Sequence, residues 1–146
     1  MDPAREYALR LLGKRPYSRR ELTDKLTGRG FPPECASDTV DWLAECGLIN
    51  DSDYAEMVVR HYSQKGFGAK KLRDELSKRG VPRELWEDAL GETPDPGETL
   101  DRLIASKLQS DAPDRAEIKK VSDYLARRGF GWADINAAMR RYLDDL

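Results

Sequence analysis

The chain has 146 residues, of which 39% are apolar and 36% are charged, and its formal net charge at neutral pH is −2. A net charge this close to zero excludes a protein that coats nucleic acid by bulk charge, although it allows a local basic face. No stretch approaches the roughly 18 apolar residues of a membrane span, and the beginning lacks the regions of a signal peptide. We therefore expect a soluble, cytoplasmic protein with no membrane partner.

The first third of the chain predicts three short helices. Residues 4–12 carry apolar side chains at helical spacing. Ser18 and Glu21 have the spacing of a capping box, which starts a second helix that ends at Gly30. A Pro-Pro corner then leads into a third helix over residues 34–46.

The middle third repeats this order. The Asn-Asp-Ser-Asp cluster at residues 50–53 consists of N-cap residues and precedes an amphipathic helix over 53–65. The decamer 72–81 forms the next helix, and a Val-Pro corner leads to a short helix around Trp86. The middle third is thus a second three-helix unit.

The last third begins after a linker signal. Residues 91–98 hold four glycines or prolines, so we expect some flexing there. The pattern then predicts one helix through residues 100–108, one capped by Asp114 and Glu117, and a last helix over 132–143. No segment shows the strict alternation of a strand.

One motif recurs in all three thirds: an apolar residue, an apolar residue four later, a glycine four after that, and an apolar residue. The copies begin at Leu22, Leu72 and Val121, which are 50 and 49 residues apart. The glycine suits the left-handed position that ends a helix. A period near fifty indicates a tandem array.

We predict an all-α fold of about nine helices. Three tandem three-helix repeats, each a helix-turn-helix-like bundle, would form an elongated modular array. The predicted boundaries are repeat 1 over 1–48, repeat 2 over 49–91, a linker over 92–99 and repeat 3 over 100–146.

The sequence shows no motif that indicates a catalytic site. The single histidine, His61, has no nucleophile motif attached to it, and Gly66-Phe67-Gly68 follows a helix where a phosphate-binding loop would follow a strand. Cys35 and Cys46 are eleven apart, too sparse with one histidine for a zinc site. We expect no enzyme, no cofactor and no metal.

The charge pattern argues against base reading by a recognition helix. The helix over 34–46 has four acidic residues and no basic one, and residues 83–90 have three acidic residues against Arg83. Such helices are repelled by phosphates. A direct DNA-binding protein of helix-turn-helix type, acting without a protein partner, stays the alternative.

The helices before each turn are basic instead, and two explanations are open. Lysines and arginines there could form i,i+4 ion pairs, such as Glu21 with Lys25 and Asp74 with Lys78. Near a helix C-terminus they could also interact favourably with the negative end of the helix dipole. They could equally present a basic edge to a polymeric partner.

The sequence also resembles a known family. The stretches that carry the resemblance are residues 17–26, 49–55, 65–72 and 75–81, together with Arg60. They look like the motifs of RecX, the bacterial regulator of the RecA recombinase, and the likeness is strongest over residues 4–90. One departure is Asn50, where the family often has Asp; Asp51 stays available as a helix cap.

The resemblance implies a cytoplasmic, non-enzymatic modulator that binds RecA and its filament on DNA. It would mainly inhibit recombinase, ATPase and coprotease activity, and so affect DNA repair and the SOS response. The implied partners are the RecA filament and single- or double-stranded DNA, bound weakly without sequence specificity, and we expect a monomer. The predicted DNA- or filament-binding residues are Arg60, Lys65, Lys70, Lys71, Arg73, Lys78, Arg79, Lys119, Lys120, Arg127 and Arg128.

Overall fold

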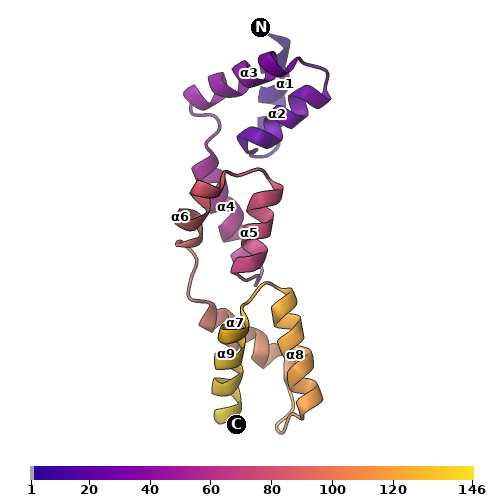
Figure 1. The fold of residues 1–146 in the computed structure, drawn as a ribbon, viewed down its shortest axis with the longest axis vertical. Coiled ribbons are helices and arrows are strands. Elements are labelled where there is room, and N and C mark those ends of the chain that lie inside the picture. Colours follow the sequence, from indigo (N-terminus) through magenta and orange to yellow (C-terminus); the bar gives the residue numbers. More distant parts are fainter. Residues whose placement is uncertain (1) are drawn as a thin grey trace. The chain divides into compact units, whose positions relative to one another are not determined.

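A computed structural model describes residues 2–146. Over these residues the regular structure is helical, with nine α-helices and one short 3₁₀-helix, η1 (Figure 1). The helices are α1 (Pro3–Leu12), α2 (Arg19–Gly28), α3 (Pro33–Glu45), α4 (Asp51–Gln64), α5 (Ala69–Lys78), η1 (Arg83–Leu85), α6 (Trp86–Leu90), α7 (Pro96–Lys107), α8 (Arg115–Arg127) and α9 (Trp132–Asp144). The all-α prediction is confirmed. No helix in the described range has the length and apolar character needed to cross a bilayer.

The chain forms two compact units. One joins the residues up to Val58 with Glu75–Ala89, and the other joins Val59–Asp74 with Leu90–Leu146. The unit boundaries therefore fall inside α4, α5 and α6, so the helices of the middle repeat are divided between the two units.

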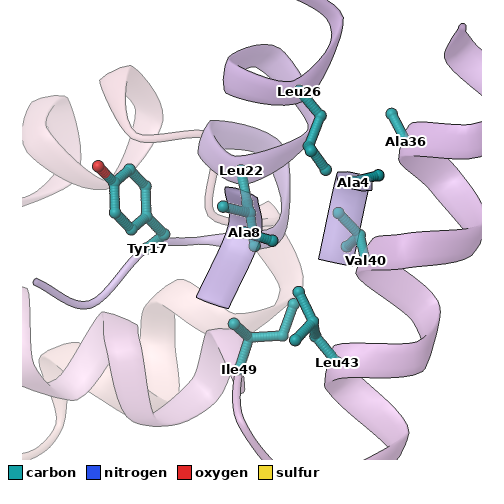
Figure 2. Packing of buried hydrophobic residues seen from close by; sticks show 9 residues of the cluster. All are labelled: Ala4, Ala8, Tyr17, Leu22, Leu26, Ala36, Val40, Leu43 and Ile49. Atoms are coloured by element: carbon teal, nitrogen blue, oxygen red, sulfur yellow. The ribbon is translucent and has the colours of Figure 1, made fainter. Parts of the chain in front are cut away.

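The first bundle has a core of its own, in which α1, α2 and α3 pack against one another. Figure 2 shows Leu22, Val40 and Leu43 gathered at the centre of this cluster, with Tyr17 at its side. Leu22, Leu26 and Leu43 have no solvent exposure. Burial of each such side chain contributes about 1.5–3 kcal/mol, which offsets the entropy of ordering three short helices.

The third bundle, of α7, α8 and α9, is built in the same way. Leu100 and Ile104 of α7, Leu125 of α8 and Ile135 of α9 are fully buried in one cluster. The repeat motif therefore supplies the second helix of each bundle with its core face, as its spacing predicted.

The three turn glycines end their helices in the left-handed conformation, with φ of 104° at Gly30, 75° at Gly80 and 100° at Gly129. In each turn the N–H of the next residue donates to the carbonyl of the second apolar residue of the motif. These bonds are Phe31 N to Leu26 O (3.1 Å), Val81 N to Leu76 O (3.0 Å) and Phe130 N to Leu125 O (3.2 Å). The prediction for the turn is confirmed.

Asn50 and Asp51, two members of the predicted N-cap cluster, bind the starts of different helices. Asn50 caps α4, since Asn50 Oδ1 accepts a bond from Asp53 N–H at 3.1 Å. Asp51 Oδ1 instead accepts from the N–H of Arg19, the first residue of α2, at 2.9 Å. Asn and Asp are equally good N-caps, so the departure at Asn50 leaves α4 with an N-cap.

α7 begins at Pro96, inside the segment predicted as a linker. Asp95 is its N-cap and accepts a bond from Gly97 N–H at 2.9 Å. Proline is well suited to the first helical position, where no N–H is needed. Helix boundaries depend on such caps, which apolar periodicity does not report.

Candidate functional site

The ends of the second helices form a junction between repeats, and one example lies within the first unit. Ser18, the N-cap of α2, donates its hydroxyl proton to the carbonyl of Arg79, just after α5. The approach is close: a Cβ on Gly80 would lie 2.6 Å from Cβ of Arg20. Glycine at this turn is thus required by packing as well as by its φ.

The second unit contains the equivalent junction. The N–H of Gly68, before α5, donates to the carbonyl of Arg128 at 2.8 Å, and Lys70 N–H donates to Gly129 O at 3.1 Å. A Cβ on Gly68 would lie 2.6 Å from the carbonyl carbon of Gly129. In both junctions the start of one second helix binds the turn of the next repeat's second helix.

Two predicted binding residues, Arg79 and Arg128, take part in contacts inside the protein. The Arg79 guanidinium donates to the hydroxyl of Tyr54 at 2.9 Å and pairs with Glu75 at 3.3 Å. Arg128 donates to the carbonyls of Lys65 and Gly66, the latter at 3.0 Å. Its guanidinium carbon also lies 4.0 Å from the centre of the Phe67 ring. The segment Gly66-Phe67-Gly68 between α4 and α5 therefore binds the Arg128 guanidinium, through the carbonyl of Gly66 and the ring of Phe67.

A polar cluster accompanies the first junction. Glu21 bonds the backbone N–H of Ser18 at 3.0 Å and pairs with Arg15 at 3.4 Å. Burial raises the pKa of Glu21, but the Ser18 N–H, the Tyr54 hydroxyl and Arg15 together lower it below its ordinary value. Burial and the bond to Glu21 raise the pKa of Tyr54. Glu21 thus belongs to this cluster, and the pair with Lys25, which was one of the two explanations left open for the basic residues, does not form.

Three of the predicted basic residues meet in a hollow of the second unit. Lys70 and Lys71 of α5 and Arg127 of α8 line a volume of about 340 Å³, in which Asp74 is the one acidic lining residue. The helix ends joined by the second junction thus bring cations from two repeats together.

A second hollow of the same unit, of about 390 Å³, shares Arg127 with the first. Lys107 and Lys120 add two cations to it, and Glu117 is its acidic residue. Tyr124 also lines it, and the Lys107 Nζ lies 4.8 Å from the centre of the Tyr124 ring. We call the two hollows together the cationic groove.

The remaining predicted residues lie elsewhere. Arg60, Arg73, Lys78 and Lys119 are exposed and line neither hollow. Lys119 pairs with Asp123 at 2.8 Å, and Lys78 lies 3.8 Å from Glu75. Lys65 is exposed, with its amine 5.7 Å from the Tyr62 ring.

Lys107 is the groove residue that the sequence analysis missed. It belongs to α7, outside the repeat motif in which basic residues were sought. Lys107 comes three residues after the buried Ile104, at the end of a helix, and this position is the sequence feature that could have identified it as a lining residue.

Neither cysteine has a metal-binding neighbourhood. Cys35 is half-buried against the first core, and Cys46 is exposed. Among residues 2–146 no three His, Cys, Asp or Glu side chains gather in a way that could hold a metal ion.

These features define a class: an all-α protein of tandem three-helix domains that join through the ends of their second helices. Family models match all three domains: the RecX first three-helix domain over residues 4–43, the second over 50–90 and the third over 95–139. The chain belongs to the RecX family.

Relatives named "Regulatory protein RecX" cover most of the chain. The one from Chromohalobacter salexigens is 40% identical over 92% of this chain and 90% of its own length. The one from Ectopseudomonas mendocina is 35% identical over 93% and 92%. A crystal structure of RecX from Lactobacillus salivarius matches with a TM-score of 0.83 and 29% identity, over 98% of this chain and 96% of that one.

Proposed function

We propose that this protein is a non-enzymatic, cytoplasmic regulator that binds the RecA recombinase filament on DNA and mainly inhibits its recombinase, ATPase and coprotease activities. It would thereby affect DNA repair and the SOS response. The observation that carries the proposal is the match of all three repeats to the three RecX domains. Relatives named as regulatory proteins also align with this chain over most of their length.

The repeat junctions support a function in which several surfaces of one chain act together. Each junction ties neighbouring repeats by hydrogen bonds and close backbone approach. A monomer that contacts successive protomers of a polymer gains avidity from several weak contacts. Contacts made through exposed lysines and arginines weaken with salt.

We further propose that the basic residues named from the sequence contact DNA or the filament, with two different roles. Arg128 holds the second junction through its guanidinium group, whereas Arg79 joins the first junction through its carbonyl and binds Tyr54 and Glu75 of its own repeat through its guanidinium. Both would influence binding through the structure that they stabilise. The exposed lysines and arginines would make the direct contacts. DNA contacts would be weak and independent of sequence.

The alternative, a DNA-binding protein that acts without a recombinase, is less well supported. The acidic residues of α3 and α6 stand where a base-reading helix needs Arg, Lys, Asn or Gln. Tight binding to naked DNA with a sequence preference would favour this alternative.

The test adds the purified protein to RecA filaments on single-stranded DNA and follows ATP hydrolysis and strand exchange. We expect both rates to fall in proportion to the protein added. A variant with Lys70, Lys71, Lys120 and Arg127 all replaced by glutamate should lose inhibition and keep its helicity by circular dichroism. Unchanged rates with the unsubstituted protein would overturn the proposal.

A further inference from the structure

We infer that a hollow of the first unit, around the exposed Leu48, docks a protein segment of the recombinase filament that carries an apolar side chain next to a carboxylate. The inference rests on the proposed function in one respect, which is that the filament is the partner. It adds a contact between proteins, made in the first repeat by residues other than those of the cationic groove.

Leu48 occupies a position where an apolar side chain ordinarily packs back onto its own helix. Gly47 ends α3 in the left-handed conformation, with φ of 75°, and the N–H of Leu48 donates to Leu43 O at 2.9 Å. The residue that follows such a glycine commonly contacts the last turns of the helix. Four other turns in the described chain have the same glycine and the same type of bond, and the residues that follow their glycines are Phe31, Phe67, Val81 and Phe130.

The exposure of Leu48 differs from that of its four counterparts. Val81 and Phe130 are 4% and 7% exposed, and Phe31 and Phe67 are half-buried. Leu48 is 50% exposed, although its backbone makes the same turn. The side chain therefore leaves apolar surface in contact with water at a position where the rest of the chain covers it.

Leu48 belongs to a continuous apolar hollow. It lines a volume of about 580 Å³ together with Leu9 and Leu12 of α1 and Pro16 of the following loop. Leu9 and Leu12 are half-buried against the first core, so the floor of the hollow is held by packed side chains and still faces solvent. A single exposed leucine is ordinary, whereas a contiguous apolar surface with a polar rim is typical of a site for a protein partner.

The rim of the hollow selects a partner with a negative charge. Lys14 and Arg15 line it, and none of its lining residues is acidic. Arg15 is already engaged, since it pairs with Glu21 at 3.4 Å and its guanidinium carbon lies 3.7 Å from the centre of the Tyr17 ring. Lys14 is exposed and has no ion-pair partner among residues 2–146.

One available cation beside an apolar floor fits a protein segment better than a nucleic acid. A strand of nucleic acid is held by several cations in a row, because it carries one charge on every phosphate. An apolar side chain that enters the hollow, with a carboxylate close to Lys14, matches both the floor and the rim.

The chain offers matched controls for both parts of the hollow. Leu146 is 56% exposed and belongs to the second unit, so Leu146→Ser makes the same chemical change as Leu48→Ser away from the hollow. Lys25 is exposed on α2 of the first unit and does not line the hollow, so Lys25→Glu is the control for Lys14→Glu.

The first experiment measures the affinity of each full-length variant for RecA filaments on single-stranded DNA by co-sedimentation, and for the bare strand by fluorescence anisotropy. Leu48→Ser should weaken filament binding roughly tenfold, as loss of an anchor side chain at an interface commonly does. Leu48→Met keeps the apolar surface and should stay within about twofold of the unsubstituted protein. Lys14→Glu should weaken binding roughly threefold or more and change its salt dependence.

Leu146→Ser and Lys25→Glu should leave filament binding unchanged, and Leu48→Ser should leave binding to the bare strand unchanged. Equal effects of Leu48→Ser and Leu146→Ser would overturn the inference. A loss of bare-strand binding in Leu48→Ser would also overturn it, because the hollow would then contact nucleic acid. Filament binding by the unsubstituted protein that Leu48→Ser does not weaken refutes the hollow alone, whereas no filament binding by the unsubstituted protein refutes the proposed function as well.

The second experiment identifies the occupant directly. A photoreactive benzophenone amino acid replaces Leu48 in the full chain, the filament complex is irradiated, and the cross-linked peptide is sequenced by mass spectrometry. We expect a recombinase peptide with an apolar residue next to Asp or Glu, and no such product from the same substitution at Leu146. Cross-linking to DNA alone, or to a recombinase peptide without acidic residues, would overturn the inference.

Discussion

The backbone N–H of Gly68 lies 2.8 Å from the carbonyl oxygen of Arg128, and this bond joins the start of α5 to the end of α8. Ser18 and Arg79 form the corresponding bond in the first unit, with a side-chain hydroxyl as donor. The repeats are therefore joined by helix ends, where polar backbone groups would otherwise need water or a cap.

The close approach at Gly68 predicts that a methyl group there is not tolerated. Gly68→Ala should lower the free energy of unfolding by about 1–3 kcal/mol, because its Cβ would lie 2.6 Å from the backbone of Gly129. Gly28→Ala is the control, since no atom lies within 4 Å of its Cβ in α2. That change should be neutral or stabilise by up to about 1 kcal/mol. Urea unfolding measures both, and equal effects would contradict the account of the junction.

Replacement of Arg128 should lower the free energy of unfolding, whereas replacement of its neighbour Arg127 should not. Arg128→Gln removes the hydrogen bonds to Lys65 and Gly66 and the contact with Phe67, so it should destabilise by about 1–3 kcal/mol. Arg127→Gln changes an exposed side chain and should stay within about 0.5 kcal/mol. Thermal unfolding of the two variants decides the point. A larger loss for Arg127→Gln would refute the structural role of Arg128.

The Ser18 side chain should contribute more to the free energy of unfolding than an ordinary helix cap does. Ser18→Ala removes both the cap on Glu21 N–H and the bond to the Arg79 carbonyl. Asp114→Ala removes only a cap, on Glu117 N–H, and should cost about 1 kcal/mol. We expect Ser18→Ala to exceed it by about another 1 kcal/mol, the net value of a buried hydrogen bond. Equal losses in chemical denaturation would show that the junction bond contributes nothing.

The lowered pKa of Glu21 predicts a pH dependence. Its ordinary value is 4.5, so the unfolded chain takes up the proton at higher pH than the folded protein does. The stabilisation is complete above that value and is lost as the pH falls through the folded pKa. Glu21→Gln should therefore destabilise at neutral pH, and its difference from the unsubstituted protein should shrink below pH 4.5. Unfolding midpoints measured across this range test the sign, which a constant difference would contradict.

Local patterns in the sequence were sufficient for the fold class and the turns. The spacing of Leu72, Leu76 and Gly80 predicts both the buried face of the helix and its end, because each depends only on residues a few positions apart. The capping box of Ser18 and Glu21 is local in the same way.

The junctions and the groove depend on contacts between residues far apart in the chain. Asp51 accepts a bond from the first N–H of α2, and Arg128 binds the carbonyls of Lys65 and Gly66; neither contact has a signal in sequence spacing. Charge alone also failed to separate Lys119, which pairs with Asp123, from Lys120, which lines the groove. Only the fold distinguishes a basic residue with an ion-pair partner from one that lines a hollow.

The most direct test of the central claim is co-sedimentation of the protein with RecA filaments assembled on single-stranded DNA with a non-hydrolysable nucleotide. We expect the protein to sediment with the filament in a saturable manner, salt to weaken the binding, and bare DNA to retain less of the protein. Binding to bare DNA as tight as to the filament, or no co-sedimentation at low salt, would contradict the claim.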